Sequence, residues 1–133
     1  MTSDAGLGLE PQVEDGVSGV RAQFPGHPIE VTSDGAGGVF TVVDDVRLGA
    51  PYAEQTTWLG FHISSAYPHS DVYPHYVGRV SRLDGQPHGE GIQNVDWRGR
   101  PALQLSRRSH RWNPGRDNAA LKAAKVMAWF LTR

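Results

Sequence analysis

Two serines and a histidine lie close together near the C-terminal end of the chain and could perform acyl chemistry. Ser106 and Ser109 precede His110 by four positions and by one position. A serine hydroxyl is a weak nucleophile that needs an adjacent base, and histidine suits that role near neutral pH. We therefore consider Ser106 as an acyl acceptor and His110 as its base. A hydroxyl that only makes a turn hydrogen bond, beside a structural His110, stays the open alternative.

Basic side chains are interleaved with these residues. Arg107, Arg108 and Arg111 could stabilise a developing oxyanion or bind an acidic partner surface. The competing interpretation is that these arginines only form a solvent-exposed surface and take no part in catalysis. Arg107 and Arg108 are therefore candidate partner-binding residues.

Other catalytic chemistries find little support. Cysteine is absent, which excludes disulfides, thiolate metal sites and cysteine nucleophiles. His69 and His75 flank Asp71, but a metal ion would need further ligands that no spacing supplies. No glycine-rich nucleotide motif, zinc-protease motif or nucleophile elbow is present. We expect no metal and no organic cofactor.

Length and charge narrow the function classes further. The 133 residues fit one domain, with 13 basic against 14 acidic residues and a formal net charge of −1. That balance argues against a non-specific nucleic-acid binder. No apolar run is long enough for a membrane span, and no signal peptide is visible. We expect a cytoplasmic protein with neither nucleic acid nor membrane as partner.

The hydrophobic pattern predicts an α+β fold. Val13, Val17, Val20 and Phe24 form one stripe of a helix that begins at Pro11. Apolar and β-branched runs then predict a four-stranded antiparallel meander, with strands at 29–32, 39–43, 57–63 and 76–80. Residues 66–101 read as a long proline-rich loop, and residues 119–131 as a closing helix. We expect a disordered segment over 1–9 and a single domain over 10–133.

The closing helix and the tryptophans allow more specific expectations. Asp117 or Asn118 can cap the helix, with Lys122 and Lys125 on its solvent face. Its expected apolar face holds Ala120, Leu121, Ala124, Met127, Ala128 and Leu131. Three of the tryptophans are expected in the core, namely Trp58, Trp112 and Trp129. Trp97 lies in a polar segment, which predicts an exposed aromatic anchor for a partner.

Several motifs in order resemble the ubiquitin-conjugating (E2) superfamily. The run Thr57-Trp58-Leu59-Gly60-Phe61-His62-Ile63, followed by Tyr67-Pro68 and Pro74, is similar to the third strand and the following turn of E2 enzymes. Trp112-Asn113-Pro114 matches their W-x-P before a helix. The segment 106–117 most resembles a bacterial E2-like family, prokaryotic E2 family E, with its S-R-H and W-x-P-G-x-D pattern. Tyr67 and Pro68 thereby join the candidate partner-binding residues, although Tyr67 is also expected to pack its loop.

The resemblance places the E2 thiol on a residue that has none. Aligning the segment 94–103 with the asparagine, turn and cysteine of E2 enzymes puts the cysteine position at Ala102. Three alternatives follow: a serine acceptor at Ser106, a non-catalytic scaffold, or an active enzyme whose cysteine was replaced by alanine.

The resemblance implies a UBC fold and a place in a bacterial ubiquitin-like conjugation pathway. Such a protein would accept a ubiquitin-like protein from an E1-like adenylating enzyme for acyl transfer to a target. JAB-type peptidases accompany this family, and its pathways are associated with antiviral defence. A chain that ends after the helix following W-x-P lacks the two C-terminal helices of eukaryotic E2 enzymes.

Overall fold

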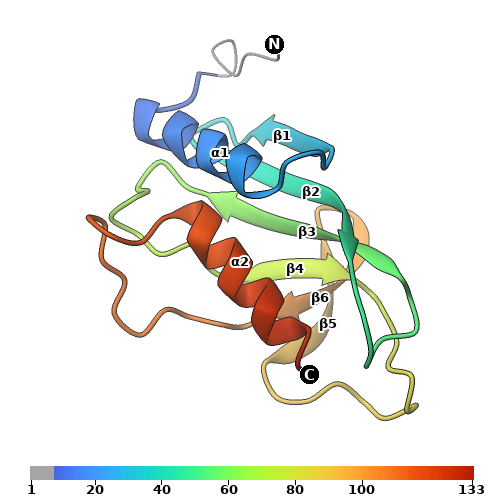
Figure 1. Cartoon of the computed structure of the whole chain (residues 1–133). Coiled ribbons are helices and arrows are strands. Elements are labelled where there is room, and N and C mark those ends of the chain that lie inside the picture. Colours follow the sequence, from blue (N-terminus) through green and yellow to red (C-terminus); the bar gives the residue numbers. More distant parts are fainter. Residues whose placement is uncertain (1–7) are drawn as a thin grey trace.

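A computed structural model describes residues 8–133, in which two helices and one six-stranded sheet follow each other along the chain (Figure 1). Every pair of neighbouring strands is antiparallel, and the strand order is β1-β2-β3-β4-β6-β5. The elements are α1 (Pro11–Gln23), β1 (Ile29–Ser33), β2 (Val39–Arg47), β3 (Thr56–Ile63), β4 (His75–Gly78), β5 (Ile92–Trp97), β6 (Arg100–Leu105) and α2 (Ala119–Phe130). The α+β class is confirmed, as are the opening helix, the meander of the first four strands and the closing helix. Residues 1–7 of the segment expected to be disordered lie outside the described residues.

The strand count predicted from the sequence is wrong by two. The segment predicted as a proline-rich loop contains β5 and the start of β6, which pair through a tight turn at Arg98 and Gly99. Both turn residues have positive φ, 50° and 83°, as the turns that suit a two-residue hairpin require. The sequence of β5 shows no clear alternation of apolar and polar residues, and three of its six residues are exposed. The pattern used to predict strands is therefore missing here.

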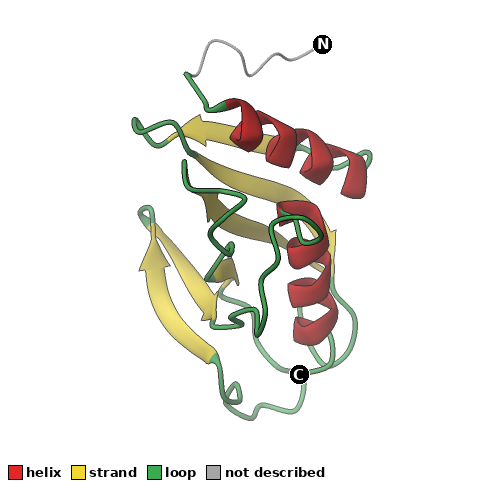
Figure 2. Ribbon diagram, turned by 90° about the vertical axis from the view of Figure 1, so that its left-hand side faces the viewer, coloured by secondary structure: helices red, strands yellow, loops and turns green. Residues whose placement is uncertain are grey.

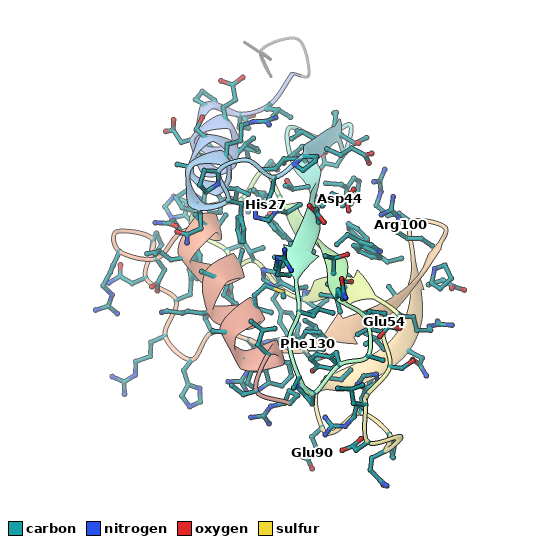
Figure 3. All side chains as sticks on the ribbon, turned by 45° about the vertical axis from the view of Figure 1, so that its right-hand side comes forward. His27, Asp44, Glu54, Glu90, Arg100 and Phe130 are labelled. Carbon is teal, nitrogen blue, oxygen red and sulfur yellow. The ribbon has the colours of Figure 1, made fainter. Side chains whose placement is uncertain are left out.

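Both helices cover one face of the sheet, and the main core fills the space between them (Figure 2). The predicted stripe of α1 is confirmed, since Val13, Val17 and Val20 are fully buried. Side chains alternate along each strand, so β3 sends Leu59, Phe61 and Ile63 into this core. Figure 3 shows Phe130 at the end of α2 between that helix and the strands, where its ring stacks on Tyr52 at 4.4 Å.

The buried face of α2 differs from the predicted one. Leu121 and Leu131 are exposed, whereas Lys122 is buried. The residues that face the sheet are Ala119, Ala120, Lys122, Ala123, Val126, Met127 and Phe130. Asn118 caps the helix, its side chain accepting a hydrogen bond from the backbone N–H of Leu121 at 2.9 Å. Lys122 can be buried on this face because Asp71 lies beneath it as an ion-pair partner.

An aromatic cluster covers the opposite face of the sheet and contains Trp97. The prediction that Trp97 is exposed is wrong, since only 9% of the residue is accessible. Its indole stacks on Tyr76 at 4.7 Å and on Trp58 at 5.8 Å. The physical reason lies at Gly60, where a Cβ would collide with the Trp97 ring. The missing side chain gives the indole room against β3. Trp58, Trp112 and Trp129, expected in the core, are only half-buried.

Neither helix in the described part of the chain, residues 8–133, is long and apolar enough to cross a membrane.

Candidate functional site at the loop before α2

The segment that joins β6 to α2 runs beside the helix and encloses a cavity with it. In Figure 1 this segment is the orange stretch that swings out next to α2. The cavity has a volume of about 320 Å³ and is lined by residues from 107–112, 116–117 and α2. Six of its lining residues are basic: Arg107, Arg108, Arg111, Arg116, Lys122 and Lys125. The cavity therefore concentrates positive charge in a chain whose net charge is −1.

A buried ion pair fixes the wall of this cavity. The Lys122 ammonium donates to both carboxylate oxygens of Asp71, at 3.0 and 2.9 Å, and to the Ser109 hydroxyl oxygen at 2.7 Å. Ser109 in turn donates to Asp71 through its backbone N–H at 2.7 Å and its hydroxyl at 3.0 Å. The loop over 64–74 is thus joined both to the segment before α2 and to α2 itself. We call Asp71, Ser109 and Lys122 the clamp.

The electrostatics of the clamp favour an ionised carboxylate. Burial raises the pKa of Asp71, but the hydrogen bonds from Ser109 and the nearby Lys122 ammonium outweigh it and leave the pKa below its usual value. Asp71 is therefore a poor proton acceptor for Ser109. The clamp holds the loop in place; it does not form a nucleophile and base.

His75 lies in the core beside the clamp with both ring nitrogens unpartnered among the described residues. It is fully buried on β4 and packs 5.2 Å from Phe61. Burial, with a smaller contribution from the Lys122 ammonium, lowers the pKa of His75 to about 3. His75 is thus an uncharged core residue at neutral pH.

Two further hydrogen bonds attach the loop over 64–74 to the start of α2 and to the segment before it. The Tyr67 hydroxyl accepts from the Ala119 backbone N–H at 3.0 Å, and the Trp112 indole N–H donates to the Pro68 carbonyl at 2.6 Å. Burial raises the pKa of the Tyr67 phenol. Tyr67 is 5% exposed, so it packs its loop and does not offer a partner-binding surface. Pro68 is half-buried under the same contact.

The structure does not bring the proposed nucleophile and base together. Ser106 follows β6, its backbone N–H donates to Gly91, and its hydroxyl accepts from the Gln104 amide at 3.3 Å. His110 is exposed in the loop and lines the cavity. Among residues 8–133, no hydrogen bond joins the two side chains. The cavity is lined by His110, Arg107 and Arg108 of the predicted site residues, whereas Ser106 does not line it.

Ala102 lies inside the sheet, away from the cavity. It is fully buried in the aromatic cluster with Val42 and Trp97. Strand alternation points it away from the helix-covered face that holds its neighbour Leu103. A thiol at this position would be covered by the indole.

The sequence interpretation missed Asp71 and Lys122 as partners. The sequence pattern offers Asp71 only as a metal ligand and predicts Lys122 on the solvent face. A signal was present, because Ala119, Ala123, Val126 and Phe130 form a helical stripe that includes position 122. Among residues 8–133, no group of three His, Asp or Glu side chains is arranged to hold a metal ion.

No family model matches the chain, and neither a curated protein nor a solved structure matches it.

Proposed function

We propose that the chain is an E2-like protein of a bacterial ubiquitin-like conjugation pathway that binds its partners without carrying the ubiquitin-like protein covalently. Its partners would be the E1-like adenylating enzyme and the ubiquitin-like protein, with a JAB-type peptidase of the same pathway as a further candidate. The order of the motifs from residue 57 to residue 117 supports this proposal. The order of elements is compatible with it: a helix, four consecutive antiparallel strands, and a helix after Trp112-Asn113-Pro114.

The burial of Ala102 carries the non-covalent form of the proposal. An acyl-carrying thiol must be reached by a donor thioester and by an attacking amine. Ala102 has no accessible surface and lies in the cluster of Trp97. Neither an alanine nor a cysteine at this position could take part in transfer while the sheet is intact.

A covalent serine acceptor is the second candidate, because the Ser106 side chain is only half-buried at the end of β6. In such a step the Ser106 oxygen would form an ester bond to the acyl carbon. The thioester bond to the E1-like enzyme would break, and a base such as His110 would take the serine proton while the thiolate leaves. The hydroxyl's only hydrogen bond among the described residues comes from Gln104, so a base would have to approach during the reaction.

A thiol introduced at position 102 is expected to be inert in the folded protein. Because the chain has no cysteine, Ala102→Cys and the control Ser65→Cys each carry a single thiol. Ser65 is exposed, so its thiol should react with a disulfide-exchange reagent about a hundredfold faster than that at 102, which needs a local opening of the sheet. Both thiols should react alike in denaturant. Equal rates in the folded state would show that position 102 is accessible. They would then favour the alternative that alanine replaces an active cysteine there.

The pathway itself is tested by incubating the chain with the E1-like enzyme, the ubiquitin-like protein and ATP. We expect a non-covalent complex by size-exclusion chromatography and no adduct on denaturing gels. An alkali-labile, thiol-insensitive adduct that disappears in Ser106→Ala would establish the serine acceptor instead. Neither a complex nor an adduct would reject the E2-like assignment.

A further inference from the structure

The basic cavity beside α2 has the charge and length of a binding groove for an extended acidic segment. Its lining residues on α2 run from Leu121 to Trp129, a distance of about 12 Å along the helix axis. An extended chain advances about 3.3 Å per residue, so this length suits three or four residues. A single small anion would instead need basic groups that converge on one point.

Most of the positive charge in the cavity is uncompensated. Lys122 is paired with Asp71, but none of the other five basic side chains has a carboxylate within ion-pair distance among residues 8–133. The one acidic residue lining the cavity, Asp117, uses a carboxylate oxygen to accept from the Asn113 backbone N–H at 2.8 Å. The groove thus offers guanidinium and ammonium groups that an acidic ligand would neutralise.

Aromatic and apolar side chains position and separate these cations. Arg107 lies over the Trp129 ring at 4.9 Å, and Arg108 over Tyr73 at 4.7 Å. Trp112, Leu121 and Val126 also line the cavity. Such contacts hold the guanidinium groups against the wall and leave apolar surface between charges. Mixed surfaces of this kind favour a peptide with both acidic and apolar side chains over a phosphate ion.

We propose that this groove binds a short, extended acidic peptide segment of a partner protein. Carboxylates would pair with the guanidinium groups of Arg111 and Arg116 and with the Lys125 ammonium, because arginine matches carboxylate geometry. The clamp keeps the wall in place while the ligand is absent. The assignment of that partner to a conjugation pathway rests on the proposed function, whereas the groove's preference for acidic peptide does not.

Fluorescence anisotropy with labelled hexapeptides tests the groove without any pathway protein. The probe alternates acidic and leucine residues as Glu-Asp-Leu-Glu-Asp-Leu, and its control replaces the acids by Gln and Asn. We expect only the acidic probe to bind, with an affinity that falls as salt screens the charges. Equal binding of the neutral control would overturn the proposal. Tighter binding of a labelled six-nucleotide oligothymidylate would overturn it in favour of nucleic acid.

Charge-reversal variants distinguish binding in the groove from attraction by the overall charge of the protein. Arg116→Glu and Lys125→Glu alter exposed side chains that make no hydrogen bond, ion pair or ring contact within the described part of the chain, so the fold should persist, as tryptophan fluorescence can verify. Each should weaken the acidic probe about fivefold through lost attraction and new repulsion. Arg47→Glu changes the net charge equally at the exposed last residue of β2, outside the groove, and should alter affinity less than twofold. An equal loss in all three would contradict a defined groove. Peptide binding that survives a failed pathway assay would reject only the pathway.

Discussion

Replacing Lys122 with alanine is expected to lower the free energy of unfolding by about 3 kcal/mol, because it leaves a buried carboxylate without its partner. The side chains of Lys122 and Asp71 are only 6% and 16% exposed, and their charged atoms lie 2.9 Å apart. Removing the ammonium also takes away a donor to the Ser109 hydroxyl. Urea denaturation followed by tryptophan fluorescence measures this change.

Two controls show whether the loss comes from the unpaired charge. Lys125→Ala lies on the same helix but is exposed, so its effect should stay within about 0.5 kcal/mol. The double variant Lys122→Met with Asp71→Asn removes both charges and should recover most of the stability lost in Lys122→Ala. A loss in Lys122→Ala no larger than that in Lys125→Ala would contradict the clamp.

Acid is expected to destabilise the protein through His75 well before the carboxylates titrate. The folded-state pKa of His75 is about 3, against 6.5 for an ordinary histidine. Between these values the unfolded chain binds a proton that the folded chain does not, so stability falls as the pH falls. From pH 6.5 to pH 4.5 the free energy of unfolding should drop by roughly 2 kcal/mol from this residue alone.

The variant His75→Leu isolates this effect. An apolar side chain of similar volume removes the titrating group, so the drop between pH 6.5 and pH 4.5 should largely disappear. His69→Gln, an exposed histidine on the loop over 64–74, should keep the wild-type pH dependence. The lowered pKa of Asp71 acts in the same direction, but only below its ordinary value of 3.8. Wild-type pH dependence in His75→Leu would contradict a buried neutral histidine.

Both predictions depend on contacts with distant segments that the chain neighbourhoods of His75 and Asp71 do not reveal. The sequence places both His75 and Asp71 in the predicted loop. The structure places His75 in β4 between Phe61 and Leu105 and pairs Asp71 with a residue 51 positions later. The pattern of neighbouring residues contains no information about these contacts between distant segments. The same limit explains Trp97, whose polar neighbours predict exposure although its ring stacks on Tyr76 and Trp58.

The sequence by itself determined the helices and strands whose side-chain pattern repeats over a few neighbouring residues. The spacing of Val13, Val17 and Val20 defined α1, β-branched runs defined the first strands, and Asn118 was one of two capping residues named for α2. Those features depend on side chains three or four positions apart, or on alternate residues. Only the tertiary structure decided which face of α2 is buried, that Ala102 is sealed under an indole, and that six basic residues share one cavity. Each of these depends on which distant segment supplies a partner charge or a gap such as Gly60, and burial energies are set by that partner.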